Sequence, residues 1–373
     1  MPSRAGPDLA APREEGLARR LARGALVLLA LAVVAATAIT LAETNTWWVR
    51  LFDFPRLQVA ALGVAVLGGL LALRRGAGRL AGVAAPALLV AALAYQGWRI
   101  APYTPTWPAE VPTAAESCPE GDRLSLVTAN VLMTRRDAGP LLALVRADPP
   151  DVLVLPETDA WWVRAFAPLD ALYPHAVREP QSNYYGMVVL SRLPLEGARV
   201  RHLVQPGVPS VHATLRLPSG AGVRLHAVHP RPPQPGQSTA PRDAELVLLG
   251  LEMRESPGPA VVAGDLNDVG WSATSRLFRA VAGVRDPRIG RGPMPTFDAT
   301  LPAALRWPLD HVFATPHLDL LRLEVLPGIG SDHRPVRADW CLVRRETGGP
   351  PPLDGKQRED AREAIRDVPP PEG

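Results

Sequence analysis

The chain has 373 residues, of which 40 are basic, 37 are acidic and two are cysteines. This length allows two domains, and two cysteines exclude both a disulfide-rich miniature scaffold and a four-cysteine zinc site. Lys356 is the only lysine, so the small net charge of +3 comes from arginine and looks like a bias in codon usage. The charge by itself does not indicate a nucleic-acid partner.

Three uncharged apolar runs lie within the first hundred residues. They cover Gly24 to Ala42, Leu57 to Leu73 and Leu80 to about Tyr95. A transmembrane helix needs roughly 20 apolar residues, so the second and third runs are at the short end of that range. We expect residues 1–23 to be a cytoplasmic segment and residues 24–98 to form an anchor of three transmembrane helices.

The arginines predict how this anchor is oriented. One cluster precedes the first run, and a second cluster fills the link between the second and third runs: Arg19, Arg20 and Arg23, then Arg74, Arg75 and Arg79. Arginine-rich segments beside membrane helices stay on the cytoplasmic side, so everything after Trp98 is expected outside. The predicted location is a bacterial cytoplasmic membrane that the chain crosses several times, with its soluble part on the extracytoplasmic side.

Two other interpretations of the apolar part are weaker. The first run could belong to a cleaved signal peptide, because Ala36-Thr37-Ala38 resembles a small-residue cleavage site. Two further apolar runs follow it, however, which favours an uncleaved helix. A transporter is disfavoured because no ionisable residue lies inside any run, and such residues mark a transport path.

The rest of the chain divides by composition. Residues 99–121 are rich in proline and predict an extended tether. Residues 344–373 are rich in proline, glycine and charge without an apolar period, so we expect a disordered tail. Between them, residues 122–343 are long enough for one globular domain with a substantial core.

This globular part has the pattern of an α+β domain. Two amphipathic stretches, Gly139 to Ala147 and Asp243 to Arg254, are expected helices. Seven short runs have the length and β-branched content of strands: Leu124 to Thr128, Val152 to Leu155, Met187 to Leu190, Val211 to Leu217, Val223 to Val228, Ala260 to Ala263 and His311 to Ala314. The fourth and fifth runs are joined by a short turn, which predicts a hairpin and much antiparallel pairing.

Polar side chains follow four of these runs at the point where each expected strand stops. They are Asn130, Glu157, His229 and the pair Asp265 and Asn267. Each has an ordinary explanation on its own, since Asn130 could cap a helix, Glu157 could be a solvated acid, and the third group could form a turn. Together they suggest an active site in which a rigid apolar scaffold gathers polar groups at the ends of its strands.

Two further segments carry acid–histidine pairs. Asp310 and His311 begin one strand, and Asp332 and His333 lie in a glycine-flanked loop before the last strand. Histidine changes protonation near neutral pH, and a buried aspartate commonly fixes its tautomer. An isolated loop histidine with satisfied hydrogen bonds is the alternative explanation for His333.

Six motifs occur in a fixed order: TAN, LPE, the HP of AVHPRPP, GDLN, LDHVF and GSDHRP. In that order they resemble the endonuclease/exonuclease/phosphatase superfamily, which includes DNase I-like nucleases, inositol-phosphate phosphatases and bacterial sphingomyelinases. The resemblance spans the globular part and none of the apolar part. It implies a four-layer α/β sandwich, with two packed mixed sheets flanked by helices, and Mg²⁺-dependent hydrolysis of phosphoesters.

The resemblance also assigns a metal site. Glu157 is similar to the family's metal-binding glutamate, Asn130 to its partner beside the metal and the phosphate, and Asp332 to a second carboxylate on the metal side. Mg²⁺ prefers hard oxygen ligands and keeps several waters, so one or two carboxylates are enough to bind it. Mn²⁺ is the alternative ion, and no zinc-binding spacing is present.

The catalytic roles come from the same resemblance. Asp265 resembles the acid that orients or deprotonates the attacking water, and Asn267 the donor that holds a phosphate oxygen. His333 resembles the histidine that faces the scissile phosphate, and Asp310 the carboxylate bonded to it. His229 matches a second histidine found in many branches, whereas His311 sits where many relatives have an aromatic residue and receives no catalytic role.

The resemblance makes a disulfide one of two possibilities for the cysteines. The first and last strands are neighbours in this superfamily, so Cys118, just before the first, and Cys341, just after the last, could be bonded. An extracytoplasmic location would permit the bond, and two separate thiols are the alternative.

The substrate and the reaction remain open at this point. Arg231 and Arg242 are expected to bind substrate phosphate, or else to be solvated surface arginines. The partners expected are the membrane and a phosphoester, either nucleic acid or a phospholipid or sugar phosphate, and no protein partner is indicated. The first function is a membrane-anchored phosphodiesterase or nuclease, and the second is a phosphatase or sphingomyelinase-like phospholipase. A catalytically silent binding module is disfavoured because competent residue types fill every expected position.

Overall fold

The computed structural model describes residues 16–115, 117–345 and 349–366. It divides into two compact units. One unit comprises the chain up to Leu41 together with Arg56–Trp98, and the other comprises Ala42–Pro55 together with the chain from Arg99 onward. The prediction that residues 24–98 form one anchor is therefore corrected, because Ala42–Pro55 belongs to the unit that contains the sheets.

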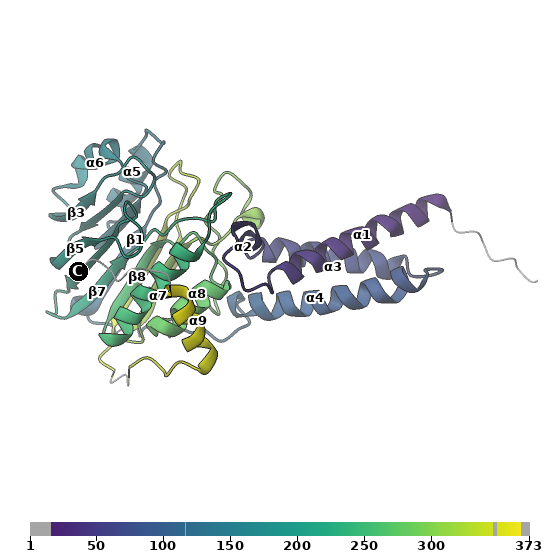
Figure 1. The fold of residues 1–373 in the computed structure, drawn as a ribbon. Helices are drawn as coiled ribbons and strands as arrows, with labels where there is room; N and C mark the ends of the chain where they lie inside the picture. The colour runs from purple at the N-terminus through teal and green to yellow at the C-terminus, as the bar shows by residue number, and fades with distance from the viewer. Residues whose placement is uncertain (1–15, 116, 346–348, 367–373) are drawn as a thin grey trace, which may run out of the picture. The chain divides into compact units, whose positions relative to one another are not determined.

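The first unit is a bundle of helices (Figure 1). Helix α1 spans Leu17–Ile39, α3 spans Arg56–Ala72, and a π-helical turn, Leu80–Ala84, leads into α4, Ala85–Ile100. Within the described residues, two helical stretches are long and apolar enough to cross a membrane, Leu17–Ile39 and Leu80–Tyr103. Helix α3 has 17 residues, which at about 1.5 Å per residue is shorter than a hydrocarbon core of about 30 Å. The structure thus supports two candidate spans rather than the three predicted.

Hydrogen bonds connect these helices near both of their ends. The guanidinium of Arg23 on α1 donates hydrogen bonds to the carbonyls of Leu73 (3.0 Å) and Arg75 (3.2 Å) in the link after α3. The two arginine-rich segments therefore lie at the same end of the bundle. Nearer the other end, Gln96 donates to the hydroxyl of Thr37 (3.0 Å), which pairs α4 with α1.

The second unit is built on two mixed β-sheets. The first sheet has the strand order β10-β11-β1-β2-β4-β3 and the second has the order β5-β6-β7-β8-β9. Two neighbouring pairs are parallel, β1 with β2 and β7 with β8, and the other pairs are antiparallel. The strands of the first sheet are β1 Arg123–Thr128, β2 Val152–Pro156, β3 His175–Glu179, β4 Met187–Ser191, β10 Leu318–Val325 and β11 Val336–Leu342. The strands of the second sheet are β5 Leu195–Arg201, β6 Ser210–Arg216, β7 Gly222–Ala227, β8 Ala260–Asp265 and β9 Asp310–Ala314.

Alternation along the strands explains the layers. In β1, Leu124 and Leu126 face the core between the sheets, whereas Val127 faces the helices on the other side. Helices α5 (Gly139–Ala147) and α6 (Ala160–Ala165) cover the first sheet, and α7 (Ala240–Glu255) and α8 (Ala273–Ala282) cover the second (Figure 1). The predicted α+β sandwich of two mixed sheets flanked by helices is confirmed.

The segment predicted as a tether, residues 99–121, is packed against the sheets. Tyr103 is buried, and its hydroxyl donates to the carboxylate of Asp286 (3.2 Å). Val111 lies in the core between the sheets, and Thr113 forms a bridge with Leu320. The described part of this segment is therefore not an extended spacer, because Tyr103 and Val111 are buried in the unit that contains the sheets.

The prediction of a disordered tail is corrected in the same way. Helix α9 spans Gly355–Ile365 and begins with a capping box formed by Asp354 and Gln357. Its buried Ala361 packs on Val247 of α7 and Val281 of α8. This apolar contact and the capping box explain why a helix forms here. Residues 346–348 and 367–373 lie outside the described residues.

The two cysteines are joined in a disulfide. Cys118 and Cys341 have Cα atoms 6.1 Å apart, and their sulfurs are bonded. The bond is possible because β1 pairs antiparallel with β11, which places Arg123 directly opposite Cys341. Of the two alternatives, the disulfide is the one the structure supports.

Candidate active site

Strand pairing brings the predicted site residues to one edge of the sandwich. Asp265 ends β8 and pairs in register with Asp310, which begins the antiparallel β9. Asn130 and Glu157 follow the parallel strands β1 and β2, and parallel strands end at the same edge of a sheet. His229 follows β7, which is parallel to β8, so it reaches the same edge as Asp265.

Asn130 connects the two sheets through its side-chain amide. Its Nδ2 donates to Oε1 of Glu157 (2.8 Å) and to Oδ2 of Asp265 (3.1 Å). Its Oδ1 accepts the backbone N–H of Leu132 (3.0 Å), and this contact fixes which way the amide faces. Asn130 therefore orients two carboxylates through its NH₂ group. Its Oδ1 has a second lone pair beside the Leu132 bond, so the predicted place of Asn130 beside the metal stays a prediction.

His333 lies between two carboxylates. Its Nδ1 is 2.8 Å from Oδ2 of Asp310, and its Nε2 is 3.4 Å from Oδ2 of Asp265. Burial disfavours the charged ring, but the two carboxylates outweigh burial and raise the pKa of His333 to about 10. The ring is therefore an imidazolium: its Nδ1–H donates to Asp310, and its Nε2 forms an ion pair with Asp265. The aromatic ring of Phe297 lies against it, with centroids 4.8 Å apart.

His229 is buried on the other side of Asp265. Its Nε2 is 3.7 Å from Oδ2 of that residue, which is beyond hydrogen-bond distance. Burial lowers its pKa, so the ring is neutral. The Tyr185 ring packs on His229 with centroids 5.6 Å apart, and the guanidinium of Arg231 lies over Tyr185 at 5.5 Å. Arg231 is thus at the margin of the cluster and is connected to it through an aromatic ring.

Asn267 is held in a left-handed backbone conformation, with φ of 52°. Its N–H donates to Oδ1 of Asp265 (2.8 Å), and its Nδ2 donates to the carbonyl of Pro230 (3.0 Å). Its own carbonyl accepts a hydrogen bond from Nη1 of Arg242 (3.0 Å). A side-chain amide carries two N–H groups, so the Pro230 contact leaves one for a substrate oxygen. Glu157 is also left-handed, with φ of 62°, and such conformations are concentrated at functional sites.

A glycine in the GDLN motif brings two site strands together. Gly264 has φ of 148°, and a Cβ added there would lie 1.9 Å from the carbonyl oxygen of Val228. Only glycine allows the backbone before His229 to approach the backbone before Asp265 this closely. The sequence indicated roles for Asp265 and Asn267 of this motif but not for Gly264. The need for glycine follows only from the close approach of the two backbones.

Two further residues were not predicted as parts of the site. Arg242 was expected to be a phosphate-binding or solvated arginine, but it is buried and donates to the Asn267 carbonyl. His311 is also buried, and Arg288 donates to its Nδ1 (2.7 Å). Because an arginine can only donate, the His311 proton is on Nε2, which donates to the carbonyl of Asp268 (2.8 Å). His311 therefore supports the loop after Asp265, in agreement with its lack of a predicted catalytic role.

The oxygen donors at this edge suit a divalent cation. Among the residues that the structure describes, Asp265, Asp310 and His333 form a buried group whose possible ligand atoms lie within 4.8 Å of one another. Glu157 lies next to this group, and burial together with the Asp265 charge raises its pKa to about 7. A bound cation would offset that cost of burying a carboxylate. The carboxylate of Asp332 accepts the Ser331 hydroxyl (3.2 Å) and is not part of the buried group.

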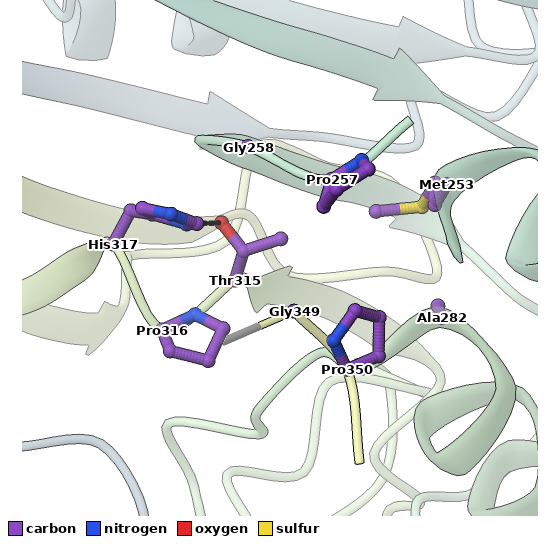
Figure 2. Close-up of a pocket in the computed structure, with 10 residues that line it drawn as sticks. Met253, Pro257, Gly258, Ala282, Thr315, Pro316, His317, Gly349 and Pro350 are labelled. Atoms are coloured by element: carbon purple, nitrogen blue, oxygen red, sulfur yellow. Dashed lines mark hydrogen bonds between the residues drawn. The ribbon is translucent and has the colours of Figure 1, made fainter. Parts of the chain in front are cut away.

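A small pocket lies at the opposite end of β8 and β9 from these residues (Figure 2). Met253, Pro257 and Pro350 line it, and its only titratable lining residue is His317, whose Nδ1 is 3.4 Å from the Thr315 hydroxyl. The pocket has no carboxylate in its lining. It is separate from the candidate active site and offers none of that site's chemistry.

A sandwich of two mixed sheets with asparagine, carboxylates and histidine at one edge defines the DNase I-like class of phosphoester hydrolases. The chain belongs to the endonuclease/exonuclease/phosphatase family, whose family model matches residues 127–333. That range contains every residue of the cluster described above. No curated protein matches the chain.

Solved structures share this fold. A TDP2 from D. rerio humanized by 14 mutations matches with a TM-score of 0.50 and 18% identity, covering 59% of this chain and 99% of that one. D. rerio TDP2 complexed with a single-strand DNA product matches with a TM-score of 0.50 and 18% identity, covering 58% and 98%. An endonuclease/exonuclease/phosphatase from Beutenbergia cavernae is 24% identical over 60% of this chain and 72% of that one, with a TM-score of 0.47. The two matches with a TM-score of 0.50 show a common fold.

Proposed function

We propose that the protein is a membrane-anchored, Mg²⁺-dependent phosphodiesterase or nuclease. The observation that carries this proposal is the continuous cluster in which Asn130 joins Glu157 to Asp265, and His333 joins Asp265 to Asp310. A water, a metal and a phosphate all need groups of these types within a few ångströms of one another. Family membership supports phosphoester hydrolysis as the reaction.

Glu157 would hold the Mg²⁺, with Asp332 as the second carboxylate on that side. When bound, the ion would neutralise charge on the phosphate oxygens and orient the ester. Asn130 keeps the Glu157 carboxylate in place through its Nδ2 hydrogen bond. Burial of Glu157 in the absence of a counter-ion favours its neutral form, so the cation and the carboxylate stabilise each other.

Asp265 would take the proton from the attacking water. Its Oδ1 is occupied by the Asn267 N–H, and its Oδ2 faces Asn130 and the ring of His333. The Asn130 and Asn267 hydrogen bonds fix the direction of this carboxylate, and a general base must be held within reach of the proton that it takes. His333, oriented by Asp310, would donate from Nε2 to a phosphate oxygen as negative charge spreads over the phosphate.

The remaining donors would bind the phosphate itself. Asn267 has one side-chain N–H available after its bond to Pro230. Arg231 lies beyond Tyr185 and would reach a phosphate or an adjoining charged group of the substrate from the margin. Neither side chain needs to change protonation, so their contribution is to bind and to orient.

The location outside the cytoplasm is part of the proposal. Two helices are apolar and long enough to span a membrane, and both arginine-rich segments lie at one end of the bundle. The Cys118–Cys341 disulfide supports an oxidising compartment, because disulfides are rare in the cytosol. A bacterial cytoplasmic membrane with the sandwich on its outer side fits both observations.

The substrate is proposed as a phosphodiester of nucleic acid, since a structure with this fold, that of D. rerio TDP2, holds single-strand DNA. The second candidate is a phospholipid or sugar phosphate, cleaved in the manner of a phosphatase or a sphingomyelinase. The membrane helices favour it, because they would keep the enzyme beside lipid.

The test is a substrate panel with the full chain purified in detergent. Single-strand DNA, double-strand DNA, RNA, sphingomyelin vesicles and phosphoinositide vesicles are each incubated with Mg²⁺ and, in parallel, with EDTA. Cleavage of a nucleic acid that EDTA abolishes supports the first candidate, and EDTA-sensitive cleavage of a lipid alone supports the second. Asp265→Asn serves as the inactive control, and hydrolysis that persists in EDTA would overturn the proposal.

A further inference from the structure

The loop that follows β8 carries one of the proposed phosphate-binding residues. It spans Leu266–Ser272, and its second residue, Asn267, has a left-handed backbone. Within the loop, Asp268 accepts the hydroxyl of Ser272 (2.6 Å). A left-handed non-glycine residue is unfavourable by itself, so surrounding contacts must keep it in place.

Arg242 of α7 contacts the loop and stabilises this conformation. Its Nη1 donates to the Asn267 carbonyl (3.0 Å), and its Nη2 is 3.7 Å from the carboxylate of Asp268. The same guanidinium is fixed by Asp243, with Nη2 to Oδ1 at 2.9 Å. Arg242 is almost completely buried, so its position depends on these acidic partners rather than on water.

Asp243 is shared with an arginine from a distant part of the sequence. Arg50 lies on the short helix α2 (Trp47–Leu51) within Ala42–Pro55, and its Nη2 is 3.6 Å from Oδ2 of Asp243. The same atom of Arg50 donates to the hydroxyl of Thr274, at the start of α8. One guanidinium from the segment before α3 therefore contacts both helices that flank the loop.

A second contact from this segment reaches the loop itself. The indole Nε1 of Trp271 donates to the backbone carbonyl of Asp53 (2.7 Å), and both residues are buried. The ring of Phe54 packs on Trp307 with centroids 5.5 Å apart, and Trp307 packs on Phe297, which contacts His333. Ala42–Pro55 thus touches the support of both the Asn267 loop and the catalytic histidine.

We propose that Arg50, on the segment Ala42–Pro55, is a positioning residue that acts on Asn267 through Asp243 and Arg242. The positioning role rests on the proposed function, because it assumes that Asn267 binds substrate phosphate. Arg50 balances a buried group in which Asp243 and Asp268 face one other arginine, Arg242. Without Arg50, Asp243 loses one of its two cationic partners. Asp243 is then free to shift, and the Arg242 guanidinium that donates to the Asn267 carbonyl is less firmly fixed.

The first test is a double-mutant cycle on the full chain. Arg50→Ala is expected to lower kcat roughly 10–100-fold with KM changed less than about twofold, since small displacements of a site group have losses of this size. In an Asn267→Ala background the same substitution should cause no further loss beyond about twofold, because its effect passes through Asn267. Trp48→Ala, on the exposed side of the same helix, is the matched control and should keep wild-type kcat. Equal losses from Arg50→Ala in both backgrounds would overturn the positioning role.

The second test does not depend on activity. Hydrogen exchange of peptides covering residues 266–272 should be at least about tenfold faster in Arg50→Ala than in wild type, while Trp48→Ala leaves it unchanged. Exchange in β1 reports whether the whole sandwich has opened. Arg50→Gln, which keeps a donor for Thr274 but removes the charge, is measured in case Arg50→Ala does not fold.

The two proposals can fail separately. If the wild-type protein hydrolyses no phosphoester, the proposed function fails, and the exchange experiment still tests whether Arg50 holds the loop. If exchange of residues 266–272 is the same in wild type, Arg50→Ala and Arg50→Gln, the positioning role is overturned even when the enzyme is active.

Discussion

Two groups of buried histidines occupy the unit that contains the sheets, and their surroundings are opposite. His333 lies between the carboxylates of Asp310 and Asp265, which raise its pKa to about 10. His212 on β6 and His226 on β7 instead contact each other, with their Nδ1 atoms 2.8 Å apart. Burial lowers the pKa of His212 to about 4 and holds that of His226 well below its usual value.

The difference shows that burial alone does not make a histidine useful for catalysis. All three rings are buried, and burial disfavours the charged form of each. Adjacent charges decide the outcome: carboxylates surround His333, whereas arginines such as Arg201 and Arg224 lie around the pair. His333 is therefore a cationic donor at the edge where strands deliver polar groups, and the pair is a neutral structural contact within the second sheet.

Substitution of His333 should lower activity, whereas substitution of His226 should lower only stability. The loss of activity in the His333 variant is the largest effect expected. His333→Ala should reduce phosphoester hydrolysis by roughly 10²–10³-fold, because it deletes a donor to the developing charge. His226→Ala should leave the rate per folded molecule unchanged and lower only the unfolding temperature. The measurement is the initial rate of hydrolysis, normalised to the amount of folded protein, for both variants. An equal loss of activity in both would contradict the different roles given to His333 and His226.

The partner of His333 should matter almost as much as the ring. Asp310→Asn keeps the shape of the side chain but removes the charge that orients and stabilises the imidazolium, so we expect a loss of roughly 10–100-fold. The loss should appear in kcat, because the residue does not contact the substrate. A His333→Ala/Asp310→Asn double variant should be no less active than His333→Ala alone, and additive losses would show that Asp310 has a separate role.

His229 is intermediate between the two groups. It is neutral like the pair, yet its Nε2 is 3.7 Å from Asp265. Because this separation exceeds a hydrogen bond, His229→Ala should lower the rate on the order of tenfold, less than His333→Ala. Steady-state kinetics of the two variants side by side give the ranking, and a larger loss for His229→Ala would reverse the assignment of the two histidines.

The smallest effect concerns stability and pH. The pKa of His212 is about 4 in the folded chain and about 6.5 when unfolded, so the unfolded chain binds the proton first as pH falls. The free energy of unfolding should therefore decrease between about pH 6.5 and pH 4, and this part of the decrease should shrink in His212→Gln. Denaturant melts of both proteins across that range test the expectation, which fails if the two pH profiles coincide.

The sequence predicted most of the site because the site is made by strand ends. Asn130, Glu157, His229 and Asp265 each follow a recognisable apolar run, and two parallel strand pairs bring them to one edge. Strands β3 and β5 were not predicted, because they are edge strands with polar, partly exposed sequences. Helix α9 was missed for a related reason, since its apolar face is limited to a few small residues.

Most of the contacts that the sequence did not predict join residues far apart in the chain. Arg50, Asp53 and Tyr103 lie in segments that look like connectors, and nothing local shows that they are buried against residues more than 180 positions away. The orientation of the Asn130 amide also depends on the backbone of Leu132, which no motif specifies. Composition showed that residues 99–121 are rich in proline but could not indicate what they pack against.

The most direct measurement of the central claim is metal-dependent hydrolysis by wild type and Glu157→Gln. This substitution keeps the side chain's size and its bond to Asn130 while removing the charge that would hold Mg²⁺. With bis(p-nitrophenyl) phosphate as substrate, we expect wild type to be active with Mg²⁺ and inactive with EDTA, and Glu157→Gln to be inactive with both. Wild-type rates in Glu157→Gln, folded and assayed with Mg²⁺, would contradict a metal-dependent centre at this edge of the sandwich.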